Sequence, residues 1–126
     1  MKDRRRKAFR AGVKAERIAA LFLMFKGYRI LAFRFKTVAG EIDLIASKHN
    51  RLVFIEVKTR SNSELCEGDL LSLVTPRQQG RIRRAADLWM SKNRVPASRD
   101  VGFDIIILRP WSLPRHYKDA FPHLSS

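Results

Sequence analysis

The sequence predicts an α/β sandwich in which helices cover both faces of a mixed sheet. Apolar residues recur at helical spacing over residues 7–26 and again over residues 75–93, whereas four other segments are rich in strand-forming residues. Three of these strands precede the second helix and one follows it. The second helix would therefore be a crossover that returns the chain to the same sheet.

The first half of the chain is expected to form a helix and then a three-strand meander. The helix is predicted from about Lys7 to Lys26, with Gly27 as its C-cap. Its apolar stripe consists of Phe9, Val13, Ile18, Ala20, Leu21, Phe22 and Phe25. The segment "YRILAFRF", residues 28–35, follows as the first strand, and a loop containing Gly40 leads to the next two.

The second half supplies the crossover helix and the last strands. Thr75 is the predicted N-cap of this helix, with Pro76 at its first position. Its buried stripe is Ile82, Ala85, Ala86 and Trp89. The segment "VGFDIIIL", residues 101–108, is apolar enough for a central strand. The tail, residues 109–126, is expected to be irregular, with a short edge strand near His116–Phe121.

Composition restricts the class of partner. The 126 residues are expected to form one domain, with residues 1–6 as a basic, disordered N-terminus. The net charge of +14 favours a polyanion, nucleic acid first and an anionic membrane surface second. No segment reaches the ~18 apolar residues of a membrane span, and Glu16 and Lys26 argue against a signal peptide. A single cysteine, Cys66, cannot form an internal disulfide, so a cytoplasmic location is expected.

The segment "GEIDLIASKHNRLVFIEVKTR", residues 40–60, predicts a β-hairpin with its turn at His49–Asn50. Antiparallel pairing about this turn places Asp43 directly opposite Glu56. Directly opposed Cβ atoms lie about 4.5–5.5 Å apart, where like charges destabilise a sheet. A hard divalent cation, Mg²⁺ or Mn²⁺, would offset this repulsion, because such ions bind carboxylates, waters and substrate phosphates.

Strand alternation assigns the hairpin side chains to two faces. One face is expected to be apolar throughout and carries Ile42, Leu44, Ala46, Val53, Ile55 and Val57. The other face carries Ile45 and Phe54 near the turn and, further from it, Glu41, Asp43, Glu56 and Lys58. The same register places Glu41 opposite Lys58. A lysine beside a metal ion could orient a water or stabilise the transition state of phosphodiester hydrolysis, which makes this charged cluster a candidate active site.

The hairpin sequences "GEIDLIA" and "LVFIEVKTR" closely resemble the YraN-type family of small bacterial proteins, which are predicted endonucleases related to archaeal Holliday junction resolvases. The resemblance extends to "GVKAERIAALFLMFKGYRIL", "VTPRQQGRIRRAA", "VGFDIIIL" and "HYKDAF", and so covers most of the chain. It implies the restriction-endonuclease-like α/β/α sandwich of the PD-(D/E)xK superfamily. It also implies Mg²⁺- or Mn²⁺-dependent endonuclease activity on DNA, including branched or structured DNA.

The resemblance also assigns roles to individual residues. Asp43 and Glu56 would be metal ligands, and Lys58 would be the catalytic lysine. Glu16 matches the acidic position of the family's first helix and would be a further ligand, direct or through water. Glu41 matches the family's Gly-Glu-Ile-Asp pattern and would support the ligands.

Two positions of the second helix bear on substrate. Gln79 matches a glutamine that is expected to contact substrate in the family. Gln78 and Gly80 depart from the basic residues that the family commonly shows on either side of it, which puts the substrate preference in question. For Asp104 in the last core strand, a structural role or a role in supporting the site residues is favoured.

Several interpretations stay open at this point. The basic side chains expected to hold DNA phosphates are Arg60, Arg77, Arg81, Arg83 and Arg84. Solvated helix arginines and strand-edge carboxylates would give the same pattern without a site. The protein could also bind nucleic acid without turnover, or lie on a membrane surface through its basic first helix. A homodimer would suit cleavage of two strands.

Overall fold

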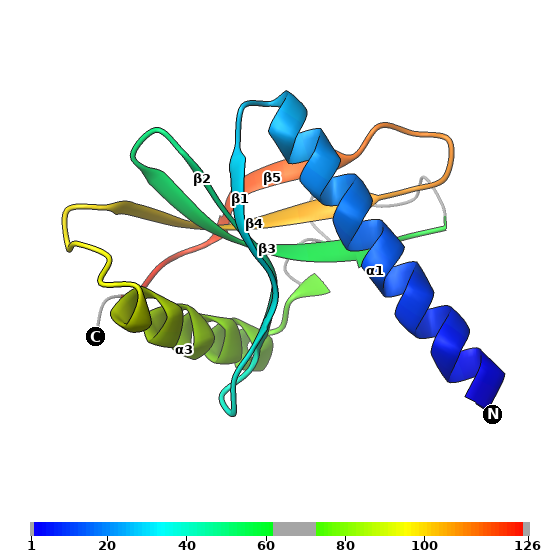
Figure 1. Cartoon of the computed structure of the whole chain (residues 1–126), viewed down its shortest axis with the longest axis horizontal. Helices are drawn as coiled ribbons and strands as arrows, with labels where there is room; N and C mark the ends of the chain where they lie inside the picture. The colour runs from blue at the N-terminus through cyan, green and yellow to red at the C-terminus, as the bar shows by residue number, and fades with distance from the viewer. Residues whose placement is uncertain (1, 62–72, 125–126) are drawn as a thin grey trace.

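The computed structural model describes residues 2–61 and 73–124, and Figure 1 shows the arrangement of the helices and strands. The elements are α1 (Lys2–Phe25), β1 (Arg29–Lys36), β2 (Glu41–Lys48), β3 (Arg51–Thr59), α3 (Pro76–Lys92), β4 (Asp100–Leu108) and β5 (Arg115–Phe121). The strands form one sheet in the order β1-β2-β3-β4-β5. Neighbouring strands are antiparallel except β3 and β4, which are parallel and joined through α3. The predicted mixed α/β fold, with its meander and crossover helix, is therefore confirmed.

The element boundaries follow from local sequence signals. The predicted C-cap Gly27 has a φ of 93°, and the amide of Tyr28 donates to the carbonyl of Leu23, which is the Schellman arrangement. Helix α1 begins at Lys2 rather than near Lys7, so residues 2–6 belong to it instead of preceding it as a disordered segment. The predicted edge strand near residue 116 is β5.

Helix α3 starts as predicted. The hydroxyl of Thr75 accepts from the amide of Gln78 at 3.2 Å, and the side-chain oxygen of Gln78 accepts from the amide of Thr75 at 3.1 Å. This reciprocal capping box, with Pro76 in the first turn, fixes the start of the helix. The residues between β3 and this helix, 62–72, which include Cys66, lie outside the described residues.

Two hydrophobic cores lie on opposite faces of the sheet, one under each helix (Figure 1). On the α1 face, small helix residues such as Ala19 and Ala20 let the helix approach the strands closely, and Leu23 fills the remaining space. On the α3 face, Ile82 packs with its neighbours against an aromatic stack that includes Phe103. Within the described part of the chain, no helix is both long and apolar enough to cross a bilayer.

The predicted hairpin register is confirmed, but the hairpin does not stay paired along its whole length. Lys48 pairs with Arg51 across the turn, and the ladder continues to Leu44 opposite Ile55, where it ends. Beyond that point β2 remains paired only with β1 and β3 only with β4. The sheet therefore splits between β2 and β3.

The split changes the direction of one side chain. Ile42 was assigned to the same face as Leu44 by strand alternation, but it packs in the core on the α3 face, whereas Leu44 packs under α1. Alternation fails here because β2 no longer shares a regular pleat with β3. The prediction that Ile42 shares one apolar face with Leu44 was therefore wrong.

Candidate active site

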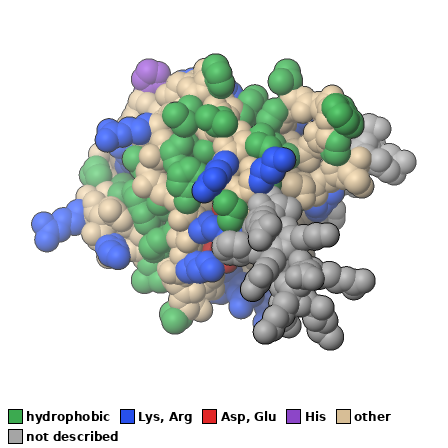
Figure 2. Space-filling model, turned by 45° about the vertical axis from the view of Figure 1, so that its right-hand side comes forward, with side chains coloured by type: hydrophobic (Ala, Val, Ile, Leu, Met, Phe, Trp, Pro, Cys, Tyr) green, Lys and Arg blue, Asp and Glu red, His purple; other side chains and the backbone are tan. Residues whose placement is uncertain are grey.

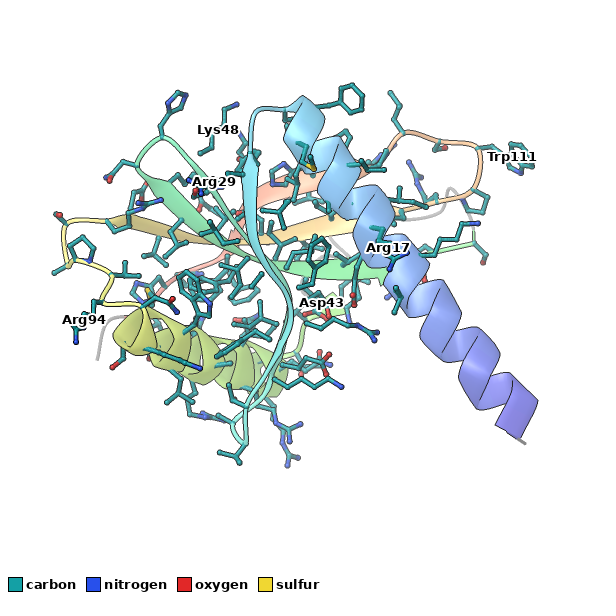
Figure 3. The ribbon with its side chains drawn as sticks, in the orientation of Figure 1. Arg17, Arg29, Asp43, Lys48, Arg94 and Trp111 are labelled. Carbon is teal, nitrogen blue, oxygen red and sulfur yellow. The ribbon has the colours of Figure 1, made fainter. Side chains whose placement is uncertain are left out.

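The candidate site lies where β2 and β3 separate. Asp43 is the first residue of β2 beyond the paired ladder, and its Oδ2 accepts a hydrogen bond from the main-chain amide of Val57 at 2.8 Å. The carboxylate thus satisfies an amide that a continued ladder would have paired with a main-chain carbonyl. The side chain of Asp43 is consequently fixed between the two strands (Figure 3).

Glu56 and Lys58 project from the same side of β3 toward this point. Their side chains are only 19 % and 21 % exposed, and the Nζ of Lys58 lies 3.4 Å from Oε1 of Glu56. Burial raises the pKa of Glu56 to about 7, and the negative charge of Asp43 adds to this effect while Lys58 opposes it. Burial also raises the pKa of Asp43. The pair can therefore retain a proton near neutral pH, as expected of two adjacent carboxyl groups.

Glu16 approaches the pair from α1 but is already engaged. Its side chain is buried, and its Oε2 lies 2.8 Å from Nε of Arg34 on β1. Burial raises the pKa of Glu16, the hydrogen bond from Arg34 opposes this, and the charge of Asp43 adds to it. Across residues 2–61 and 73–124, no group of three or more His, Cys, Asp or Glu side chains is placed to hold a metal ion. Of the three predicted metal ligands, Asp43 and Glu56 are the two whose carboxyl groups lie next to each other.

A cavity of about 140 Å³ adjoins Glu56. The described residues that line it are Gly40, Glu41, Glu56, Val74, Gln78, Arg81 and Ile82. Glu41 thus lies at the site, but the expected pairing with Lys58 is wrong. Because the sheet splits, Glu41 pairs with Lys36 of β1, and Lys58 forms its ion pair with Glu56.

The β1–β2 turn is held tightly against α3. The hydroxyl of Thr37 accepts from the amides of Ala39 and Gly40 and donates to the carbonyl of Gly40. A Cβ on Gly40 would lie 2.9 Å from the main-chain oxygen of Arg81, closer than real Cβ atoms approach. Gly40 therefore permits the contact that brings Glu41 and Arg81 into one cavity.

The basic residues predicted for DNA binding do not all lie on one surface. Arg77, Arg81 and Arg84 are exposed and recur at helical spacing along one side of α3, which continues from the cavity. Arg60 follows β3, and its Nη1 donates to the carbonyl of Thr59 at 2.6 Å. Figure 2 shows one face on which Lys and Arg side chains are widely spread while acidic side chains are visible only in a small area.

Gln79 and Arg83 face the protein instead. The amide nitrogen of Gln79 donates to the carbonyl of Val74 at 3.0 Å, and its oxygen accepts from Arg83. Arg83 also donates to the carbonyl of Pro122 at 2.8 Å and lies over the ring of Phe121. The neighbouring Gln78 lines the cavity beside Glu56. Sequence reasoning missed Gln78 as a site residue, although the spacing of Gln78, Arg81 and Ile82 on α3 was a signal for it.

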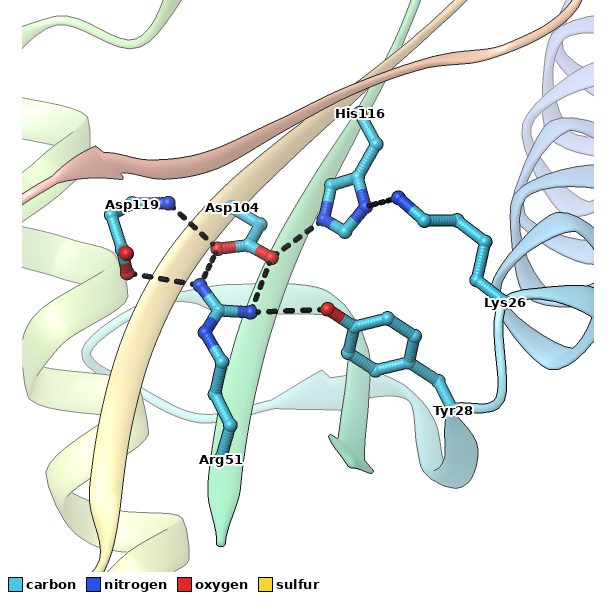
Figure 4. A network of polar contacts seen from close by, with 6 residues as sticks. All are labelled: Lys26, Tyr28, Arg51, Asp104, His116 and Asp119. Atoms are coloured by element: carbon cyan, nitrogen blue, oxygen red, sulfur yellow. Dashed lines mark hydrogen bonds and ion pairs between the residues drawn. The ribbon is translucent and has the colours of Figure 1, made fainter. Parts of the chain in front are cut away.

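Asp104, on the α1 face of the sheet, is fully buried and is saturated with partners (Figure 4). Arg51 contacts both of its oxygens, at 2.6 and 2.8 Å, His116 contacts Oδ2 at 2.6 Å, and the amide of Asp119 donates to Oδ1. Burial alone would raise its pKa, but the hydrogen bonds from Arg51 and His116 lower the pKa of Asp104 to about 2. This network supports the structural role expected for Asp104.

Fold and site together define a small mixed α/β protein with a carboxylate pair and a lysine at a split in its sheet. The family model described as "Uncharacterised protein family UPF0102" matches residues 15–108, which include Glu16, Asp43, Glu56 and Lys58. The chain belongs to this UPF0102, or YraN-type, family, so the predicted family is confirmed.

The relatives support this membership over nearly the whole chain. A UPF0102 protein of Rhizobium leguminosarum is 48% identical over 117 residues, which cover 93% of each chain. A UPF0102 protein of Agrobacterium fabrum is 48% identical over 119 residues, or 94% of each chain. One from Rhodopseudomonas palustris is 47% identical, with 90% of this chain and 82% of the relative covered. None of these names states an activity.

The pKa of Glu56 leads to a prediction about stability and pH. A carboxyl group whose folded-state pKa, about 7, exceeds its ordinary value of 4.5 makes the fold lose stability as pH rises between these values. Without divalent ions, Glu56→Gln should therefore melt above the parent at pH 8. The difference in stability between Glu56→Gln and the parent should shrink or reverse at pH 5. Between the two pH values, the difference in unfolding free energy should change by on the order of a few kcal/mol. Thermal melts in chelator measure it.

The matched control is Glu41→Gln, which removes an exposed carboxylate from the same cavity. Its difference from the parent should be similar at the two pH values. If the melting temperature of Glu56→Gln also differed from that of the parent by the same amount at both pH values, the pKa of Glu56 would not be raised in the folded protein.

Gly40→Ala should destabilise the protein because the added Cβ would meet the backbone of Arg81. Overpacking of this kind costs typically about 1–3 kcal/mol, so the melting temperature should fall by several degrees. Gly80→Ala is the contrasting variant. Its Cβ would meet only the flexible end of Arg84 at 3.4 Å, and alanine favours the helix, so it should melt at or above the parent. A Gly40→Ala protein as stable as the parent would mean that the turn does not pack on α3.

Proposed function

We propose that the protein is a divalent-metal-dependent endonuclease that hydrolyses phosphodiester bonds in DNA. The observation that carries this proposal is the partly buried Asp43–Glu56 pair with Lys58 at 3.4 Å from Glu56, in a chain of net charge +14. Partly buried carboxyl groups with raised pKa values, grouped with a lysine beside a cavity, are typical of functional sites.

The donor set fits Mg²⁺ or Mn²⁺. Asp43 and Glu56 offer carboxylate oxygens, which hard cations prefer, and two carboxylates suffice when waters and substrate phosphate complete the coordination. The proton that the pair can retain near neutral pH would be displaced by such an ion, because metal ligands bind in their deprotonated form. When bound, the ion supplies Lewis-acid polarisation of a phosphoryl oxygen.

The protein's own residues have distinct roles in this proposal. The amide of Val57 holds the Asp43 carboxylate in place, and Glu56 positions the ammonium group of Lys58. Lys58 stabilises the additional negative charge that develops on the phosphate as the bond breaks. Glu16 is the third acidic residue, coupled electrostatically to Asp43 and balanced by Arg34.

Nucleic acid is the proposed substrate because exposed basic residues continue from the site along α3. Arg77, Arg81 and Arg84 would contact phosphates along α3, and contacts of this kind carry no sequence information. We place the activity in the cytoplasm. Gln79, which is bonded to Val74 and Arg83, supports the helix start rather than reaching substrate in this proposal.

One alternative has a specific observation in its favour. Glu16 is ion-paired with Arg34, and no group of three or more possible ligands is placed to hold a metal ion among the described residues. A protein that binds nucleic acid without cleaving it would not need a third acidic ligand or a bound metal ion. Cleavage and binding must therefore be measured separately.

Glu56→Gln and Lys58→Ala should each reduce Mg²⁺- or Mn²⁺-dependent nicking of supercoiled plasmid by on the order of a hundredfold or more, because each removes a group that acts on the reacting phosphate. DNA affinity measured in chelator should change less than about twofold, because the arginines carry most of the binding. Lys92→Ala removes an equal charge from an exposed position and should cleave like the parent. Two site variants that nick at the parental rate would show that the active site is elsewhere.

Metal binding at the pair should appear as thermal stabilisation. An ion at ten times its dissociation constant adds about 1.4 kcal/mol, a few degrees for a chain of this size. At pH 8, above the raised pKa of Glu56, Asp43→Asn should melt at or above the parent without metal, because it removes one of two repelling charges, and should gain much less from Mn²⁺. Asp87→Asn, which changes an exposed carboxylate on α3, should respond like the parent. Equal metal-induced shifts in the parent and Asp43→Asn would place the ion elsewhere.

A further inference from the structure

A larger groove, of about 630 Å³, lies on the α1 side of the sheet, between α1 and the ends of β3 and β4. Three cationic side chains among its described lining residues come from different elements: Lys14 from α1, Arg60 after β3, and Arg109 after β4. Ile18, Leu108 and Pro110 give it apolar walls. Such a combination suits a ligand that carries both anionic groups and apolar surface.

Arg109 gives an independent indication of a ligand. Its Nε is buried, and no hydrogen-bond acceptor reaches it in the structure of the described chain. Buried donors nearly always have a partner, so an unsatisfied guanidinium nitrogen at the wall of a groove calls for an external acceptor. A phosphate oxygen is the acceptor that an arginine fork binds best.

Trp111 stands beside this groove, one residue after Pro110, and is fully exposed. Figure 3 shows its side chain projecting away from the connection between β4 and β5. Its φ is 60°, in the left-handed region that a bulky residue rarely adopts. An exposed indole in a sparsely populated backbone conformation is more consistent with a binding role than with a folding role.

We propose that this groove binds a single-stranded stretch of nucleic acid, with phosphates on Lys14, Arg60 and Arg109 and one base stacked on Trp111. Cationic grooves combined with an exposed aromatic side chain are the usual means of binding single strands. A base in a duplex is stacked between its neighbours and cannot present its face to an indole without leaving the helix.

This inference rests on the proposed function in one respect, since it takes nucleic acid as the partner. It then defines the substrate class. Thr59 and Arg60 line the groove and follow Lys58 directly, and a strand rises about 3.3 Å per residue, so the groove begins about 3 Å beyond the lysine along the chain, at the end of β3 and on the opposite face of the sheet from Lys58. The preferred substrate is therefore DNA with an unpaired strand next to the scissile bond, such as a flap or overhang.

The test uses the fluorescence of Trp111 in chelator, where no cleavage occurs. The chain has two tryptophans, and Trp89→Phe keeps the edge-to-face packing on Phe54 while leaving Trp111 as the reporter. Titration with a 15-nucleotide oligothymidine should quench Trp111 saturably, and a hairpin duplex of equal nucleotide number should quench it far less. In case Trp89→Phe folds poorly, Trp111→Ala with Trp89 intact should show no such quenching.

Affinity measurements provide the matched controls. Trp111→Ala and Arg109→Gln should each weaken binding of the single strand by about fivefold or more and change duplex binding by less than twofold. Leu113→Ala removes a similarly exposed apolar side chain from the same connection. Arg99→Gln removes another arginine whose buried Nε has no partner among the described residues, and Arg99 lines a different cavity. Both controls should bind the single strand like the parent.

Three outcomes would overturn the inference: equal quenching by the duplex, an equal loss of affinity in Leu113→Ala, or a blue shift of Trp111 on phosphatidylglycerol vesicles without quenching by the oligonucleotide. The last would identify an anionic lipid surface as the partner. Absence of single-strand binding by the parent, with plasmid nicking intact, would refute the groove alone. Intact binding without any metal-dependent nicking would refute the proposed catalysis alone.

Discussion

The candidate site depends on one hydrogen bond, which the main-chain amide of Val57 donates to the carboxylate of Asp43. A sheet can separate two strands only if the amides released from the ladder find other acceptors, because an unpaired buried amide is strongly unfavourable. Asp43 provides such an acceptor, and the strands then diverge enough to leave a cavity beside Glu56. The same carboxylate therefore opens the sheet and contributes to the acidic pair within it.

The acidic clusters around Asp104 and Glu56 illustrate how similar side chains acquire opposite properties. Asp104 receives hydrogen bonds from Arg51, His116 and a main-chain amide, and its pKa falls to about 2. Glu56 has one lysine at 3.4 Å and a carboxylate beside it, and its pKa rises to about 7. A saturated carboxylate stabilises the fold, whereas an undersatisfied pair retains affinity for a proton or a cation.

Sequence reasoning succeeded where local rules are sufficient. The equal distances of Asp43 and Glu56 from the His49–Asn50 turn were enough to predict that their carboxyl groups lie close together, because hairpin register follows the turn, although the ladder ends one pair short of them. The caps at Gly27 and Thr75 were likewise predictable from residue type. Family membership was also correct, since the hairpin motif is specific.

The errors, and the contacts that were not predicted, arose where an element has competing partners. Ile42 and Glu41 follow β1 after β2 leaves β3, and no pattern within the hairpin reveals that preference. The ion pair between Glu16 and Arg34 joins α1 to β1, where Arg34 has a φ of 48°, a conformation that nothing in its sequence context indicates. Gln78, rather than Gln79, lines the cavity, because one position along a helix turns a side chain by about 100°.

The parallel pairing of β3 with β4 has a consequence for the order of events in folding. β2 and β3 are joined by a two-residue turn and can associate early, whereas β4 begins at Asp100 and reaches β3 only after α3 has formed a crossover. Glu56 pairs with Ile105 of β4 in the finished sheet, so its burial is complete only once β4 has docked. We expect occupancy of the acidic pair to act mainly on the lifetime of the native state, because contacts that form after the rate-limiting step govern unfolding rather than folding.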